Sequence, residues 1–180
     1  NSQGVSIYVI GNEMNNPREW PEGQPILPAD YARCFNLAYQ RIKEADPKAI
    51  VCPGAVDPYN AALFAAPHNS PYGDMRVYWK TMLNNITQCD GLSVHAYTHG
   101  PDPRLVEDQD RVFGNAPLAT VRYHFWVFED VLNETPERFR HLPVYLTETN
   151  HLFPVNEPNW GWADTNKGWV RKRWILRARA

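Results

Sequence analysis

The stretch YVIGNEMNNP, residues Tyr8–Pro17, carries an apolar run into Gly11 and then places an amide and a carboxylate, Asn12 and Glu13, side by side. The apolar run begins upstream as VSIYVIG (Val5–Gly11). A short apolar segment that is continuous rather than alternating is typical of a parallel strand covered on both faces. The stretch therefore predicts a buried strand that ends in a polar pair.

Three further segments share this character: AIVCPGA (Ala49–Ala55), GLSVHAY (Gly91–Tyr97) and LPVYLTE (Leu142–Glu148). Helical patterns follow the four segments at residues 28–47, 74–86 and 118–134, and from Thr165 or Asn166 onward. This alternation of strands and helices predicts a parallel α/β fold with right-handed crossovers. The longer loops follow the strand ends, which is the side where α/β barrels carry their catalytic residues.

The composition fits a soluble α/β protein. Hydrophobic residues make up 43% of the 180 residues and charged residues 21%, which argues against disorder. The net charge of −2 gives no sign of a nucleic-acid partner. No apolar run approaches the roughly 20 residues of a membrane helix, so we expect no membrane partner. Without a signal peptide or an initiator Met the chain looks processed or truncated, and its location, secreted or cytoplasmic, stays open.

Three cysteines, Cys34, Cys52 and Cys89, stand far apart in the sequence. No CxxC spacing is present, so neither a zinc cage nor a dense disulfide framework is indicated. We expect all three to be buried free thiols, the usual state of unpaired cysteine. The residues give no indication of a bound metal ion or of any other cofactor.

Two glutamates stand out, because Glu13 follows the first predicted strand and Glu148 ends the fourth. Both belong at the carboxyl ends of strands, so we expect them on the same rim. A facing pair of carboxylates is what glycoside hydrolysis requires, one to protonate the leaving oxygen and one to attack or to activate water. Taken singly, each glutamate has a simpler interpretation as a solvated loop residue, because glutamate is rarely buried.

The motifs IGNEMN, VHAY and YLTETN, in this order and each at a predicted strand end, resemble glycoside hydrolase clan A, the retaining (β/α)8-barrel hydrolases. The resemblance covers strands four to seven of that barrel. It implies a partial TIM barrel, in which residues 1–180 form a single unit of four βα repeats equivalent to the second part of the barrel. Such a unit is a fragment or half of a catalytic domain, and a second chain that completes it is a possible partner.

The same resemblance implies roles for individual residues. Glu13 is the acid/base and Asn12 the residue that binds the sugar 2-hydroxyl. Glu148 is the nucleophile, with His95 and Tyr97 near it. The implied reaction is hydrolysis of a β-linked oligo- or polysaccharide with retained configuration and without a cofactor.

Other residues have weaker claims to a role in substrate binding. The indole rings of Trp20, Trp160 and Trp162 lie on the predicted loops, where they are either platforms for sugar rings or packing residues. Asn150 follows Glu148 closely and either contacts substrate or caps the loop.

Two other classes of function stay open. The first is a non-catalytic partial barrel that binds carbohydrate or assembles with another chain. The second is a metal-dependent hydrolase that uses His95, His99 and Glu148. The spacing of the two histidines, i and i+4, suits a zinc site on a helix but sets them far apart on a strand.

Overall fold

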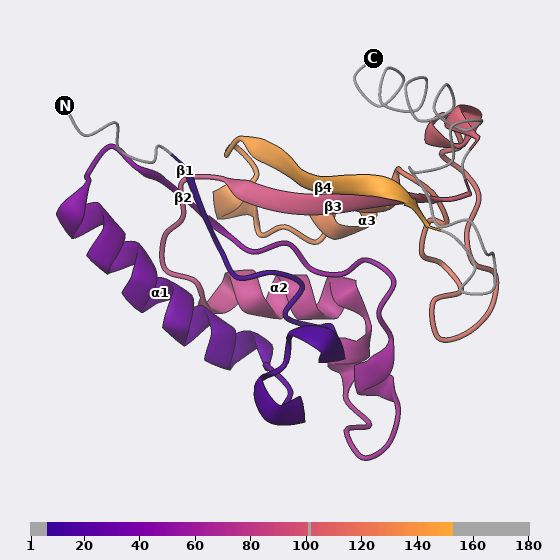
Figure 1. Ribbon diagram of the computed structural model, residues 1–180, viewed down its shortest axis with the longest axis horizontal. Coiled ribbons are helices and arrows are strands. Elements are labelled where there is room, and N and C mark those ends of the chain that lie inside the picture. Colours follow the sequence, from indigo (N-terminus) through magenta and orange to yellow (C-terminus); the bar gives the residue numbers. More distant parts are fainter. Residues whose placement is uncertain (1–6, 101, 153–180) are drawn as a thin grey trace, which may run out of the picture. The chain divides into compact units, whose positions relative to one another are not determined.

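The computed structural model describes residues 7–100 and 102–152, which divide into two compact units (Figure 1). Unit 1 comprises residues 7–95 and 131–147, and unit 2 comprises residues 96–100, 102–130 and 148–152. The strands are β1 (Ile7–Ile10), β2 (Ile50–Pro53), β3 (Leu92–His99) and β4 (Val144–Leu152). The α-helices are α1 (Pro28–Ala45), α2 (Met75–Asn85) and α3 (Val127–Leu132). Short 3-10 helices occupy Pro17–Glu19, Pro21–Gly23, Ala62–Phe64, Pro71–Gly73, Pro103–Val106 and Glu137–Phe139.

The strands form two separate pairs. β1 and β2 are parallel, with Ile7 opposite Ile50 and Ile10 opposite Pro53. β3 and β4 form the second pair and are also parallel. Residues 92–95 and 144–147 of this second pair belong to unit 1, and its remaining residues belong to unit 2. All four strands that the sequence predicts are therefore present, with bounds shifted by a few residues.

The prediction of a partial (β/α)8 barrel made of four βα units is wrong. Within the described residues β2 and β3 do not join in one sheet, and no barrel-like arrangement is present. Side-chain bonds join β2 to the start of β3 and the residues just before it, beside the backbone bond from the N–H of Asp90 to the carbonyl of Val51 at 2.9 Å. The carboxylate of Asp90 accepts the N–H of Val51 at 3.0 Å, and the hydroxyl of Ser93 donates to the carbonyl of Pro53. Pro53 also has no N–H to donate.

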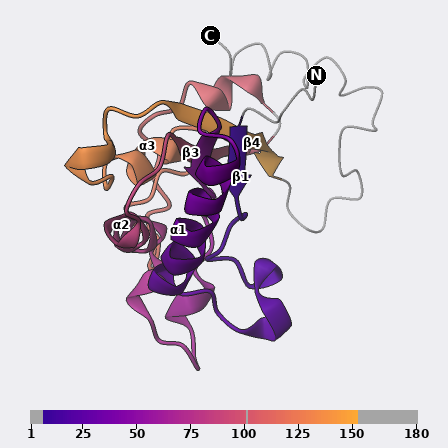
Figure 2. The same cartoon turned by 90° about the vertical axis from the view of Figure 1, so that its left-hand side faces the viewer.

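Helices α1 and α2 lie side by side in unit 1 and pack against each other (Figures 1 and 2). Asp74 caps the start of α2 by accepting the N–H of Arg76. The buried residues of each helix recur at the three- and four-residue spacing of a single helical face. They are Pro28, Tyr31, Ala32 and Phe35 in α1, and Met75, Tyr78, Trp79, Met82 and Leu83 in α2.

The helix predicted over residues 118–134 is much shorter in the structure, where α3 comprises only Val127–Leu132. Two backbone N–H groups that precede α3 make hydrogen bonds that are not those of a helix. The N–H of Arg122 donates to the carboxylate of Asp130 at 2.7 Å, and the N–H of Tyr123 donates to the carbonyl of Arg111 at 2.7 Å. These bonds hold the segment in turns, although its apolar spacing favours a helix. The fourth predicted helix lies outside the described residues.

Unit 2 has a small core of its own. Ala96, Val106 and Phe125 are buried together, and Trp126 and Phe128 pack against them. The indole N–H of Trp126 donates to the carbonyl of Val106 at 2.8 Å, which ties the segment before α3 to the loop after β3.

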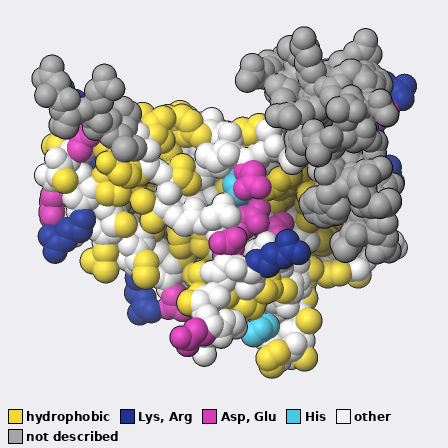
Figure 3. Space-filling model, viewed as in Figure 1, with side chains coloured by type: hydrophobic (Ala, Val, Ile, Leu, Met, Phe, Trp, Pro, Cys, Tyr) yellow, Lys and Arg dark blue, Asp and Glu magenta, His cyan; other side chains and the backbone are white. Residues whose placement is uncertain are grey.

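Several strand residues that the apolar pattern predicts to be covered are exposed. Ile7 and Val9 of β1 are 41% and 39% exposed, and Val144 and Leu146 of β4 are 44% and 41% exposed. Hydrophobic side chains are visible on the surface in the space-filling view (Figure 3). Continuous apolar strands are typical of sheets covered on both sides. In the described residues one face of these strands is only partly covered.

The cysteines differ from one another. Cys52 and Cys89 are buried free thiols, as predicted, whereas Cys34 is exposed, so that part of the prediction is wrong. Burial raises the pKa of Cys52 to about 11 and that of Cys89 to about 12, which leaves both thiols protonated and unreactive at neutral pH. None of the helices in the described ranges has the length and apolar character needed to cross a bilayer.

Candidate functional site

Glu13 lies in a strained turn at the end of β1. Its backbone is left-handed, with φ +40°, and so is that of Gly11, with φ +83°. A side chain at Gly11 would meet the ring of Tyr31 at 3.2 Å. The N–H of Glu13 donates to the carbonyl of Ala55 at 2.9 Å, which holds the turn against the segment after β2. A left-handed non-glycine residue costs about 1–2 kcal/mol, and such strain is typical of functional sites.

The carboxylate of Glu13 is held on both sides. Its Oε1 lies 2.8 Å from Nδ1 of His95 on β3, and its Oε2 accepts a hydrogen bond from the amide of Asn16 at 3.1 Å. The side chain of Glu13 is 13% exposed and that of His95 is 3% exposed. Unit 1 therefore contains a largely buried carboxylate at a strand end, with a fixed orientation and a titratable neighbour.

Asp57 is a second carboxylate in the same network, and the sequence analysis missed it. Its Oδ2 accepts from the amide of Asn16 at 3.0 Å. Its backbone exchanges two hydrogen bonds of 2.8 Å with the side chain of Asn15. Burial raises the pKa of Asp57 to about 6, and repulsion from Glu13 adds to that shift. A signal was available, because Asp57 follows the apolar run of β2 as Glu13 follows that of β1.

Tyr31 joins the end of β1 to the residue that follows β2 through hydrogen bonds of its hydroxyl group. Its hydroxyl donates to the carbonyl of Ile10 and accepts the N–H of Gly54 at 2.7 Å. Burial raises the pKa of Tyr31, so the hydroxyl keeps the proton that it donates. The helix α1 thereby fixes the point from which the chain turns toward Glu13 and Asp57.

Replacing Tyr31 with phenylalanine is expected to lower the free energy of unfolding by about 1 kcal/mol. The cost is modest because the Gly54 N–H and the Ile10 carbonyl also bond each other at 3.0 Å and keep that bond. Urea unfolding of the wild type and of Tyr31→Phe measures the difference. An unchanged urea midpoint would show that the hydroxyl does not hold the strand ends.

The other predicted site residues divide between the units. Asn12 in unit 1 is exposed next to Glu13. Tyr97, Glu148 and Asn150 belong to unit 2, where Tyr97 is buried, Glu148 is exposed and Asn150 is half-buried. The oxygen of the Asn150 side chain accepts the adjacent N–H of His151 at 2.8 Å, as a capping residue does.

Within unit 1, Nδ1 of His95 bonds the carboxylate of Glu13. The resemblance places His95 near Glu148, and that neighbourhood stays a prediction. The structure thus brings together Glu13 and His95 among the predicted residues, and adds Asn15, Asn16 and Asp57. The pairing of Glu13 with Glu148 stays a prediction.

Among the tryptophans, only Trp20 falls in the described residues, and Trp160 and Trp162 lie outside them. Trp20 is 9% exposed. Its indole N–H donates to the carbonyl of Met14 at 2.8 Å, and its ring meets the edge of His68. This setting favours the packing interpretation of Trp20 over that of an open sugar platform.

The metal-dependent alternative requires His99. In unit 2 the side chain of His99 is hydrogen-bonded and packed between aromatic rings. Its Nδ1 bonds the carbonyl of Tyr123, its ring stacks on that of Tyr123 with centroids 4.0 Å apart, and Phe113 meets its edge. Burial lowers the pKa of His99, which favours the neutral ring. These contacts indicate a packing role for His99.

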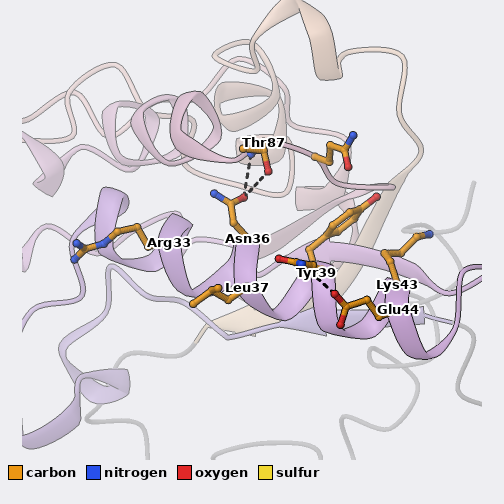
Figure 4. A pocket seen from close by; sticks show the side chains of 9 residues that line it. Arg33, Asn36, Leu37, Tyr39, Lys43, Glu44 and Thr87 are labelled. Carbon is orange, nitrogen blue, oxygen red and sulfur yellow. Dashed lines mark hydrogen bonds between the residues drawn. The ribbon is translucent and has the colours of Figure 1, made fainter.

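A surface hollow of about 770 Å³ lies along α1 and the segment after α2 (Figure 4). Several of its polar groups are bonded within the protein. Asn36 bonds Thr87, Glu44 bonds Arg41, and Lys43 bonds both the carbonyl of Ala49 and the carboxylate of Asp90. The hollow therefore lacks the convergent polar groups of a ligand site, and the network around Glu13 is the better candidate.

Comparisons with known proteins find no match. Neither the models of protein families nor the curated proteins nor the solved structures include a match to this chain. The resemblance to retaining glycoside hydrolases therefore rests on the sequence motifs and stays a prediction.

Proposed function

We propose that this chain hydrolyses a β-linked glycan with retained configuration, with Glu13 as the acid/base and Glu148 as the nucleophile. The observation that carries the proposal is the setting of Glu13. Its carboxylate is largely buried at a strand end, on a strained backbone, and is oriented by His95 and Asn16. Glu148 lies in the middle of β4 and not, as the sequence predicts, at its end, because the strand continues to Leu152. Its side chain is exposed and therefore accessible to a substrate.

The proposed reaction has two steps. In the first step a carboxylate oxygen of Glu148 forms a bond to the anomeric carbon, the glycosidic bond breaks, and the leaving oxygen takes the proton of Glu13. In the second step Glu13, now ionised, takes a proton from water, and the water oxygen replaces Glu148 at the anomeric carbon. Two inversions give a product with the original configuration.

The surroundings of Glu13 suit a residue that gains and loses a proton in each cycle. The side chain of Glu13 is largely buried, and its charge and that of Asp57 repel each other when both groups are ionised. The hydrogen bond from Asn16 and the contact with Nδ1 of His95 fix the direction of the carboxyl group. A pair of carboxylates in one network is a recurrent source of acid and base roles in enzymes.

The test is hydrolysis of a panel of nitrophenyl β-glycosides and β-linked oligosaccharides by the 180-residue chain. We expect at least one member to be cleaved, and proton NMR to show the β-anomer as the first product. Glu13→Gln and Glu148→Gln should each lose most of this activity while keeping the circular dichroism spectrum of the wild type. An α-anomer as first product, or a panel in which no member is cleaved, would contradict the proposal.

A further inference from the structure

Asn16 joins two carboxylates in unit 1. Its amide nitrogen lies 3.1 Å from Oε2 of Glu13 and 3.0 Å from Oδ2 of Asp57. An amide group has two hydrogens and can donate to both oxygens at once. The oxygen of the same amide accepts the N–H of Arg18 at 3.0 Å, which fixes the orientation of the group. Asn16 is 9% exposed, so water competes little for these bonds.

Asp57 is itself fixed from several sides. Its backbone is bonded to the side chain of Asn15, which is 2% exposed, and its Oδ1 accepts the N–H of Tyr59 at 2.9 Å. A carboxylate held in this way keeps its place relative to Asn16. The positions of Asp57 and Glu13 are therefore coupled through a single rigid amide.

We propose that Asp57 is a positioning residue for Glu13. Through Asn16 it fixes the direction of the Glu13 carboxyl group, which donates its proton to the leaving oxygen. The inference rests on the proposed role of Glu13 and adds a residue that the sequence motifs do not contain.

Within unit 1 the titratable groups of this network are Glu13, Asp57 and His95. Burial is the largest cause that raises the pKa of Asp57 to about 6, and the charge of Glu13 is the second. The bonds from Tyr59 and Asn60 and the proximity of His95 act in the opposite direction. Because the repulsion between two carboxylates is mutual, the charge of Asp57 also disfavours loss of the proton from Glu13.

The first test follows the side-chain carboxyl groups of Asp57 and Glu13 by carbon-13 NMR as a function of pH. In Glu13→Gln the repulsion is gone, so Asp57 should titrate at a lower pH than the value of about 6 in the wild type. In Asp57→Asn, Glu13 should lose its proton at a lower pH than in the wild type. Unchanged titrations in both variants would overturn the inference.

The second test is the pH dependence of kcat/KM. An acid catalyst must be protonated, so activity falls as the pH rises through the titration of Glu13. Without the charge of Asp57, Glu13 is expected to lose its proton more easily, because the repulsion between the two carboxylates is gone. The basic limb of the profile should therefore move to lower pH in Asp57→Asn, and a limb that stays in place would contradict the positioning role.

Asp74→Asn is the matched control, because it removes the same charge from a partly buried carboxylate that caps α2 and pairs with Arg76. It should leave both the titration of Glu13 and the basic limb unchanged. The two NMR titrations need no turnover. Coupled titrations in a chain without hydrolase activity would reject the proposed function and keep the contact, whereas activity with uncoupled titrations would reject the role of Asp57 alone.

Discussion

Glu13→Gln should lower kcat/KM for a β-glycoside with an alkyl or sugar leaving group by about 1,000-fold, and for a nitrophenyl β-glycoside far less. An alkoxide is a poor leaving group and needs the proton of the acid, whereas a nitrophenolate departs without one. Because kcat/KM reports the steps up to the first irreversible one, it isolates the attack of Glu148 and the departure of the leaving group. The measurement is initial rates on both substrates at one pH.

The same variant should show a second sign of its missing base. Departure of nitrophenol stays fast in Glu13→Gln, but water then attacks the glycosyl-enzyme without help. A burst of nitrophenol equal to the enzyme concentration, followed by slow turnover, is the expected time course. Stopped-flow absorbance on the nitrophenyl substrate measures the burst.

Glu148→Gln provides the contrast, because the loss of a nucleophile does not depend on the leaving group. It should slow both substrates by similar factors and give no burst. If Glu13→Gln slowed both substrates equally and Glu148→Gln spared the nitrophenyl substrate, the two roles would have to be exchanged. Equal losses in both variants, without a burst in either, would contradict the assignment of an acid and a nucleophile.

The strands could be predicted from the sequence because each is a local property of a short apolar run. Their arrangement could not, because it depends on a few long-range bonds. Asp90 lies two residues before β3 and Ser93 is the second residue of β3, and nothing in their own neighbourhood says that their side chains bond Val51 and Pro53 of β2. These side-chain bonds, with the backbone bond from Asp90 to Val51, join the two strands without forming one sheet.

The shortened α3 has a similar cause. Its apolar spacing predicts a helix over residues 118–134. In the structure, backbone N–H groups in the first part of this segment bond the carbonyl of Arg111 and the carboxylate of Asp130 instead of helical carbonyls. Arg111 lies seven residues before the expected helix, outside the range of any local helical signal. Tertiary contacts therefore overrode a helical preference that was weak from the start.

The candidate site was predictable in part. Glu13 follows an apolar run and its role as a strand-end residue could be inferred, whereas its contact with His95 joins residues 82 positions apart. Asp57 carries the same local signal as Glu13, yet motif resemblance directs attention elsewhere. A rule that selects every acidic residue within a few positions of a predicted strand end would have included it.

Gly54→Ala should lower the free energy of unfolding by about 3 kcal/mol, because the new methyl group has no space and its neighbours are backbone atoms. A Cβ at this position would lie 2.6 Å from the carbonyl oxygen of Gly11 and 2.8 Å from that of Ile10. The ends of β1 and β2 would have to separate, which weakens the bonds from the Gly54 N–H to Ile10 and Tyr31. Urea unfolding followed by tryptophan fluorescence measures the loss.

Gly23→Ala separates this clash from the general cost of replacing a glycine. Gly23 has a left-handed backbone, φ +73°, and no atom lies within 4 Å of its Cβ position. Its replacement should cost only the left-handed strain, about 1–2 kcal/mol. Gly54→Ala should also disturb the titration of Asp57, three residues further along, whereas Gly23→Ala should not. If the two variants unfold at the same urea concentration, β1 and β2 do not approach closely at Gly54, and the turn that presents Glu13 is held by other contacts.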